Sequence, residues 1–266
     1  MKFSIKEILT ISSLIIFGGL IAFGIFLFEK SDKQPSNNID KDTLTENNEQ
    51  RQTNENQTIP YSISIEKEQH GIISINYPVM SGFSDSQVQI SFNNAVKQTV
   101  ENEVNISATD NYPANWYEAV EVHIVKQSEN FISILISKNA YKGGAHDTGV
   151  ESSAFNYDLR NNKVLVLKNI FRENVDYLSI LSKATYNDLI AEYEEKTYGD
   201  WFQEGTSPKD ENFDAVTFSE QGLEIYFDDY QIGSYASAIL GPITISYGTV
   251  KEYLNPESVV ATQFLR

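Results

Sequence analysis

The stretch Tyr141–Asp147 (Tyr-Lys-Gly-Gly-Ala-His-Asp) holds the residues of this sequence best suited to chemistry. His146 beside Asp147 could form an oriented acid/base pair, because a carboxylate can orient an imidazole that moves protons. Adjacency in the chain, however, does not bring two side chains face to face, and no serine or metal partner accompanies them. Gly143 and Gly144 permit a positive φ and a close backbone approach. The pattern therefore indicates either a site or, preferably, a glycine turn whose histidine bonds to the backbone.

Other catalytic or metal-binding patterns are missing from the sequence. The histidines are His70, His123 and His146, and no two of them stand four residues apart on one helix face. There is no cysteine, which excludes disulfides, thiolate zinc sites, cysteine nucleophiles and a lipidated-cysteine anchor. The zincin, α/β-hydrolase, P-loop and dinucleotide motifs are also absent. We therefore predict no catalytic residue, no metal site and no cofactor.

The first residues of a calcium-binding loop have the pattern Asp-x-Asn-x-Asp, which Asp210, Asn212 and Asp214 match. In such a loop a tight turn aims oxygen atoms at one point. The sixth position is Ala215 rather than glycine, and the twelfth is Gln221 rather than glutamate. A solvated loop is the better interpretation.

Phe227-Asp228-Asp229 shares three residues with a motif of polysaccharide deacetylases. Those enzymes also need a pair of histidines four apart, and Tyr230 stands where they have glycine. We expect these aspartates to mark the end of a strand.

The charge balance excludes nucleic acid as a partner. Asp and Glu number 37 against 20 Lys and Arg, for a net charge of -17, and phosphate binding needs clustered cations. The 266 residues, 41% of them hydrophobic, are enough for one or two domains with a real core.

An uncharged segment, Ile8–Phe28, spans 21 residues and predicts a transmembrane helix, since it would reach roughly 30 Å. A cleaved signal peptide is the alternative, but the segment is long and no small-residue cleavage site follows it. We expect residues 1–7 to form a cytoplasmic tail and the rest of the chain to lie outside the membrane. Residues 29–60 are polar and predict a disordered linker.

The remaining sequence, from Tyr61 onward, mixes strand and helix periodicities and predicts an α+β fold. Its strands occur in adjacent pairs separated by single helices, which favours antiparallel sheets with helices packed on one face. Two helices are expected, one capped by Ser84 and Gln87 and one beginning near Glu173. The expected strands are Tyr61–Glu66, Ile72–Tyr77, Val120–Ile124, Phe131–Ile136, Glu151–Leu159, Lys163–Leu167, Ala215–Ser219, Gly222–Asp228 and Pro242–Tyr247, followed by a short helix through Val250 and Leu254.

Tyr141–His146 resembles the Y-x-G-G-A-H signature of an RsiV/PdaC-type bacterial extracytoplasmic module. The module occurs in a lysozyme-sensing anti-sigma factor and, in its first half, ahead of a peptidoglycan deacetylase. Its second half is a domain of unknown function numbered 3298. Ser234 replaces a common proline of that family, and the interval from Tyr235 to Gly241 is longer than usual. Further similar segments are Phe155–Leu159, Val164–Leu167, Ile170-Phe171, Asn212-Phe213, Gly222–Phe227, Tyr230–Ile232, Tyr235-Ala236 and Gly241-Pro242.

The resemblance implies two small lobes, 61–168 and 169–256, before a C-terminal tail, 257–266. It also implies a non-catalytic binding module of the cell envelope, with lysozyme-like proteins as partners. The signalling role does not carry over, since we expect seven residues before the membrane helix to be too few to grip a sigma factor. A peptidoglycan- or carbohydrate-binding module is the alternative, and a hydrolase using His146 and Asp147 is the third hypothesis. The residues expected to bind the ligand are Tyr141, Gly143, Gly144, His146 and Tyr235.

Overall fold

The structure, a computed structural model, describes residues 59–104, 113, 115–144, 149–193, 195–234 and 241–265. All of them belong to one unit of the chain, residues 56–266. The predicted transmembrane segment Ile8–Phe28 lies outside the described residues. Within the described ranges, no helix is long and apolar enough to cross a bilayer.

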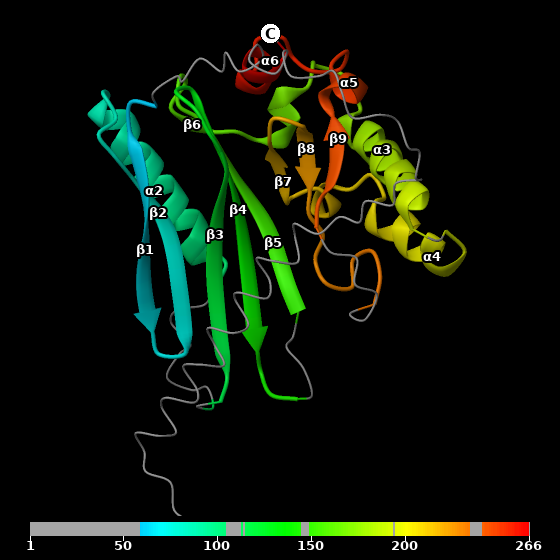
Figure 1. Cartoon of the computed structure of the whole chain (residues 1–266), viewed down its shortest axis with the longest axis horizontal. Helices are drawn as coiled ribbons and strands as arrows, with labels where there is room; N and C mark the ends of the chain where they lie inside the picture. Colours follow the sequence, from blue (N-terminus) through cyan, green and yellow to red (C-terminus); the bar gives the residue numbers. More distant parts are fainter. Residues whose placement is uncertain are drawn as a thin grey trace, which may run out of the picture. The chain divides into compact units, whose positions relative to one another are not determined.

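Six strands form the first sheet, in the order β1-β2-β3-β4-β5-β6 (Figure 1). All neighbouring strands are antiparallel except β2 and β3, which run parallel. The expectation of antiparallel sheets is therefore confirmed for the other strand pairs and wrong for β2 with β3. A helix, α2, connects β2 to β3 and carries the chain back to the starting edge, and such a crossover produces a parallel pair. The strands are β1 Ser62–His70, β2 Ile73–Ser81, β3 Tyr117–Gln127, β4 Phe131–Tyr141, β5 Gly149–Asp158 and β6 Lys163–Val164.

Helix α2, Ser86–Asn102, begins one residue later than the predicted cap implies. The carboxylate of Asp85, rather than the hydroxyl of Ser84, accepts from the backbone N–H groups of Gln87 and Val88, at 2.9 and 3.2 Å. An aspartate satisfies the free N–H groups of the first turn as well as a serine does, and its charge suits the positive end of the helix dipole.

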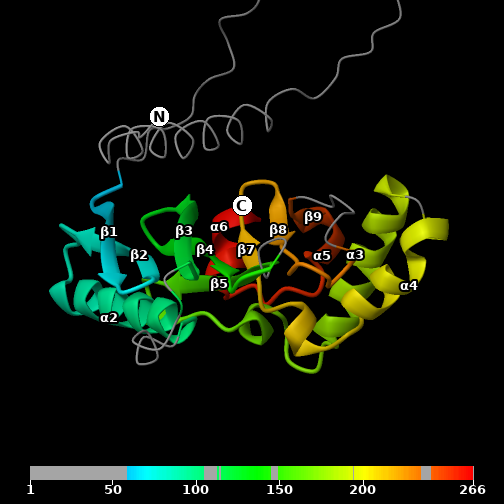
Figure 2. The same cartoon turned by 90° about the horizontal axis from the view of Figure 1, so that it is seen from below.

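The apolar face of α2 packs on one face of the first sheet (Figure 2). Phe92 is completely buried there and meets the rings of Phe155 and Tyr157 edge to face, at centroid distances of 5.9 and 5.4 Å. The predicted helix is confirmed, and its four inward positions are all buried. These positions are Val88, Phe92, Val96 and Val100.

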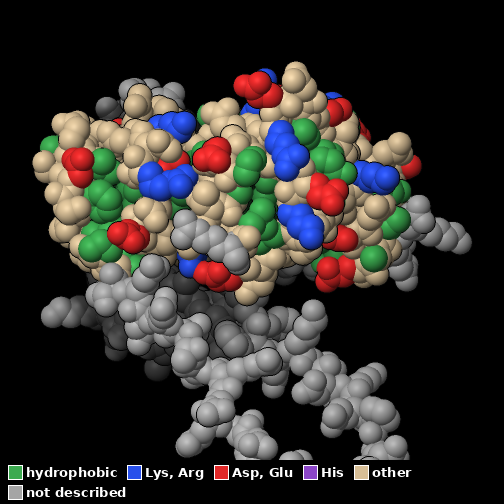
Figure 3. Space-filling view, turned by 90° about the horizontal axis from the view of Figure 1, so that it is seen from above, with side chains coloured by type: hydrophobic (Ala, Val, Ile, Leu, Met, Phe, Trp, Pro, Cys, Tyr) green, Lys and Arg blue, Asp and Glu red, His purple; other side chains and the backbone are tan. Residues whose placement is uncertain are grey.

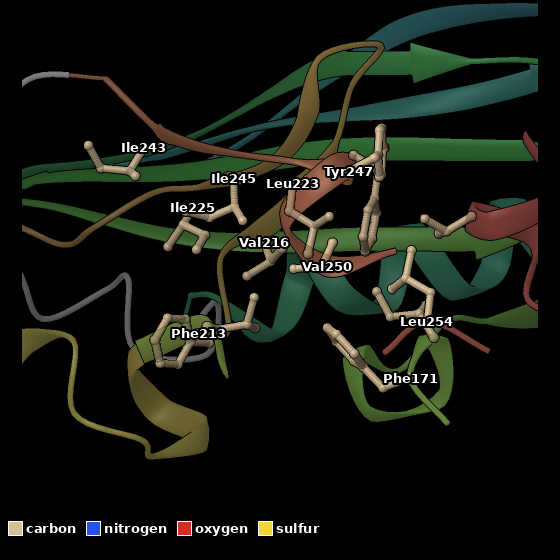
Figure 4. Packing of buried hydrophobic residues seen from close by; sticks show 14 of the residues in the cluster. Phe171, Phe213, Val216, Leu223, Ile225, Ile243, Ile245, Tyr247, Val250 and Leu254 are labelled. Carbon is tan, nitrogen blue, oxygen red and sulfur yellow. The ribbon is translucent and has the colours of Figure 1, made fainter. Parts of the chain in front are cut away.

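The second sheet has three antiparallel strands in the order β7-β8-β9. Its apolar side chains form a second core with those of the helices around it (Figure 4). Together the two cores confirm the α+β class. The elements are η2 Leu167–Ile170, α3 Tyr177–Glu192, α4 Glu195–Gly205, η3 Asp210–Asn212, β7 Val216–Phe218, β8 Gly222–Ile225, β9 Ile243–Ser246, α5 Tyr247–Val250 and α6 Val259–Phe264.

Two of these helices, α4 and α6, have no counterpart among the predicted elements. Among its described side chains, α4 has a fully buried residue, Phe202, and this one apolar anchor does not create a recognisable stripe. Helix α6 lies within the segment 257–266 that was expected to be a tail. The Ser258 hydroxyl caps it by accepting from the N–H of Ala261, at 3.1 Å, and its first three residues are buried.

Two polar residues of the first sheet connect it to β7. The buried Ser133 hydroxyl donates to Asn156 Oδ1 at 2.6 Å and accepts from the N–H of Phe218 at 2.9 Å. The Asn156 amide donates to the carbonyl of Val216 at 2.8 Å. These bonds satisfy the outer backbone edge of β7, which would otherwise be costly to bury.

Candidate functional site

The first sheet changes character where α2 ends. On the helix-facing side, Val120 of β3 and Ile136 of β4 are buried in the core. Side chains on one face alternate with period two, so the same face continues with Glu118 on β3 and Lys138 on β4. Because α2 ends at Asn102, the strands run on past their apolar cover and present charged groups there.

These charged groups line a cavity of about 480 Å³ beside the end of α2. Lys142 Nζ pairs with Glu118 Oε1 at 3.1 Å, and the Glu118 side chain is only 10% exposed. Lys138 pairs with the exposed Glu151. The cavity therefore holds both signs of charge and suits a polar ligand. Its lining residues are Glu101, Asn102, Glu103, Val104, Glu118, Lys138 and Lys142.

The Gly143-Gly144 turn borders this end of the sheet. Both glycines have positive φ, 83° and 128°, which confirms the prediction that they serve the backbone. The Tyr141 hydroxyl closes the turn by donating to the carbonyl of Gly144 at 3.1 Å. A Cβ on Gly143 would lie 3.3 Å from Nε1 of Trp116, so the first glycine also makes room for the indole.

Aromatic rings lie beside the turn. Tyr141 at the end of β4 stacks on Tyr117 at the start of β3, with centroids 6.1 Å apart and ring planes at 22°. The Tyr117 side chain is 41% exposed, and Trp116 is half-buried. The sequence analysis named Tyr141 but missed both neighbours, because their proximity depends on the pairing of Tyr117 with Tyr141 across two strands.

His146 and Tyr235, the other two predicted ligand-binding residues, lie outside the described residues, as does Asp147. His70 contacts Glu68 at 3.3 Å, and His123 is exposed on its strand. Among the residues that the structure describes, no group of three or more histidines and carboxylates is placed to hold a metal ion.

Asp228 and Asp229 follow the end of β8 and bind the edge of β5. The N–H of Ser152 donates to Asp228 Oδ1 at 2.6 Å, and that of Val150 donates to Asp229 Oδ2 at 2.9 Å. The Asp229 N–H donates in turn to the carbonyl of Val150 at 3.0 Å. These aspartates thus extend the sheet at the start of β5, a role that their sequence does not reveal.

The acidic segment around η3 is tied to its neighbours. The Asn212 amide donates to the carbonyls of Glu204 and Ser207, at 3.1 and 2.9 Å, which uses its donors within the protein. The Asp214 side chain remains exposed to solvent in part. Its partial burial, together with the nearby carboxylates of Asp228 and Glu103, raises its pKa to about 6. Like charges and partial desolvation both favour the neutral acid.

Comparisons with known proteins match this architecture in two parts. Residues 64–148 match the family model described as Deacetylase PdaC, and residues 168–246 match the model for a protein of unknown function, DUF3298. The two matches follow one another along the chain in this order. The resemblance to a PdaC-type region followed by the 3298 domain is therefore confirmed.

A curated relative is the peptidoglycan-N-acetylmuramic acid deacetylase PdaC of Bacillus subtilis, 30% identical over 189 residues. The match covers 70% of this chain and 39% of that protein, so the chain spans about two fifths of the relative's length.

Solved structures of the DUF3298 family share the fold. One from Bacteroides fragilis has a TM-score of 0.56 at 19% identity and covers 77% of this chain and 97% of its own. Another, from Pseudomonas aeruginosa, has a TM-score of 0.57 at 15% identity and covers 74% and 95%.

These comparisons contradict one prediction. The sequence analysis expected a chain that is not an enzyme, on the absence of any recognisable catalytic constellation. The relative carries the name of an enzyme, and the model matched by residues 64–148 bears a deacetylase's name, which points to an enzyme instead. A catalytic site can be assembled from residues far apart in the chain, and such a site leaves no local motif in the sequence.

Proposed function

We propose that this chain acts on the bacterial cell wall by binding peptidoglycan at the Gly143-Gly144 end of the first sheet. The observation that carries the proposal is the exposed ring of Tyr117, which stacks on the half-buried ring of Tyr141 beside that turn. Sugar rings have apolar faces that pack on aromatic rings, and an exposed phenol offers such a face with a polar tip. The choice of peptidoglycan as the polymer rests on the name of the relative.

The cavity on the other face of the same strands supports the proposal. Peptidoglycan carries amide, carboxylate and amine groups on its peptides and hydroxyls on its sugars. The ion pairs of Lys142 and Lys138 line a polar space of about 480 Å³, within the usual size range of ligand pockets. One end of the sheet therefore offers an aromatic face and a charged cavity.

Co-sedimentation of the purified chain with insoluble peptidoglycan tests the proposal. Tyr117→Ala removes the exposed ring and should reduce binding at least several-fold, whereas Tyr253→Ala, which removes a ring of similar exposure (39%) elsewhere, should not. Equal binding by the two variants, with both folded by circular dichroism, would refute the assignment of this surface.

Acetate release from the same peptidoglycan tests the activity in the relative's name. Release by the wild-type chain, reduced in Tyr117→Ala in proportion to binding, would assign deacetylation to this chain. Binding without release would leave the binding site in place and assign the chemistry to another protein or segment.

We also propose that Ile8–Phe28 anchors the chain in the cell membrane, with the described residues outside the cytoplasm. The length and lack of charge of that segment support the proposal. The full-length chain should sediment with membranes and resist extraction by salt or carbonate. A shortened, soluble protein beginning near Ser31 would refute it.

A basic lysozyme-like protein is a second candidate partner, which the net charge of -17 favours. The face in Figure 3 shows Lys and Arg interspersed with Asp and Glu, so a uniformly acidic docking surface is not visible there. If charge steers this encounter, raising the salt concentration should slow association more than it speeds dissociation. Surface plasmon resonance across a salt series measures both rates, and binding indifferent to salt would exclude charge steering.

A further inference from the structure

A second cavity, of about 440 Å³, lies between β5, with the segment that follows it, and the region that matches DUF3298. One side comes from β5 and the segment that leads into η2, and the other from the start of α3 and the η3–β7 segment. The volume lies in the usual range for small-molecule pockets. Its main apolar residues are Leu165, Leu167 and Phe213, and its main polar residues are Tyr177, Asp210 and Asp214.

The apolar part of this cavity is accessible to a ligand. Val166 lines it and is 57% exposed, the largest exposed fraction given for any large apolar residue in the described part of the chain. Tyr177, half-buried, adds an aromatic ring, and its hydroxyl donates to Asp210 Oδ1 at 2.6 Å. The cavity thus combines an apolar wall with a phenol that a carboxylate holds in place.

The polar part of this cavity carries negative charge. Among the described residues, neither Asp210 nor Asp214 forms an ion pair, and Lys168 is the cation that also lines the cavity. The Asp214 carboxylate is also repelled by the carboxylates of Asp228, which follows β8, and of Glu103, at the end of α2. A ligand cation placed here would relieve the repulsion among these carboxylates.

We propose that this cavity binds a sugar unit bearing a free, protonated amine, with Asp214 and Asp210 receiving the ammonium group and Val166 and Tyr177 contacting the ring. Removal of an N-acetyl group from a glycan leaves such an amine, so the choice of ligand rests on the proposed function at peptidoglycan. The cavity would then distinguish deacetylated from acetylated glycan.

Isothermal titration of the full chain with two probes, a glucosamine tetramer and an N-acetylglucosamine tetramer, tests this site. At pH 7 the glucosamine tetramer should bind about tenfold more tightly than the N-acetylglucosamine tetramer, which is the effect of one charge-assisted hydrogen bond. Equal affinity, or preference for the acetylated tetramer, would overturn the proposal.

Asp214→Asn should reduce the affinity for the glucosamine tetramer about tenfold, since the neutral amide keeps the shape and loses the charge. Glu211→Gln is the matched control, because Glu211 is an exposed residue in the middle of η3 that does not line the cavity, so the change removes one nearby charge. Equal losses in the two variants would show that general charge, and not this site, attracts the probe. Circular dichroism checks that both variants are folded.

The affinity for the glucosamine tetramer should also fall between pH 7 and pH 5. Asp214 loses its charge across this range, with its pKa of about 6, whereas acidification can only add protons to the sugar amine. Asp210, Asp228, Glu103 and Lys168 are the other charged groups around it, and Asp214→Asn should therefore flatten the profile if Asp214 is the group that titrates. An unchanged slope in that variant would overturn the role of Asp214.

The two proposals can fail separately. A chain that sediments with peptidoglycan through Tyr117 but does not distinguish the tetramers retains the proposed function and loses this site. A chain that prefers the glucosamine tetramer but does not sediment with peptidoglycan retains this site and loses the proposed function.

Discussion

Strands β3 and β4 behave as core along one part of their length and as surface along another. Under α2, Val120 and Ile136 are buried, whereas beyond the end of the helix Glu118, Lys138 and Lys142 take the same face. The pairing of the strands continues through both regions. The difference teaches that the length of the covering helix, and not the sheet itself, decides where core ends and a binding surface begins.

The largest effect is expected under the helix. Phe92→Ala removes a fully buried ring that meets Phe155 and Tyr157, and should lower the free energy of unfolding by about 3–5 kcal/mol because it leaves a cavity. Ile90→Ala, at an exposed position of the same helix, should change it by less than about 0.5 kcal/mol. Urea unfolding measures both, and similar values would mean that α2 does not cover the core as described.

Beyond the helix, the two lysines should differ from each other. Lys142→Met leaves the Glu118 carboxylate nearly buried without its partner and should cost about 1–2 kcal/mol. Lys138→Met leaves an exposed Glu151, which water can solvate, and should cost less than about 1 kcal/mol. A reversed order in urea unfolding would contradict the difference in burial between the two carboxylates.

The glycine turn should tolerate substitution less well than an ordinary helical glycine. Gly143→Ala and Gly144→Ala each force a side chain into positive φ and should destabilise by about 1 kcal/mol or more. Gly143→Ala should also shift tryptophan fluorescence, because its Cβ approaches Trp116, whereas a Cβ on Gly144 meets nothing within 4 Å. Gly248→Ala in α5 is the control and should be neutral or stabilising. Unchanged melting temperatures in both turn variants would refute this account.

The smallest effect concerns pH. The pKa of Asp214 is raised to about 6 in the folded state from an ordinary 3.8, so folding favours the protonated form. The contribution of Asp214 to the free energy of unfolding is fully present at low pH and is lost as the pH rises through about 6. Asp214→Asn should therefore melt slightly higher than wild type at pH 7.5, with the difference shrinking toward pH 4. A difference between Asp214→Asn and wild type that stays constant over this pH range would contradict the shift.

Much of the fold was predictable because helices and strands leave local periodic patterns. The stripe of α2, the alternation of β3 and the positive φ of the glycine pair all follow from residues close in the chain. The family resemblance also depended only on short motifs and their order, and the comparisons confirm it.

The sequence by itself thus determined most of the elements, the acidic balance and the family resemblance, since each depends on composition or short-range spacing. The tertiary structure alone decided the parallel pairing of β2 with β3, the position of Trp116 against Gly143, and the attachment of Asp228 and Asp229 to β5. It also decided that residues of β5 and of the DUF3298-like region line one cavity, with Asp214 near Asp228 and Glu103. In these features the residues that meet can be more than 100 positions apart in the chain, as Asp214 and Glu103 are. Local patterns carry no information about which distant segments will meet.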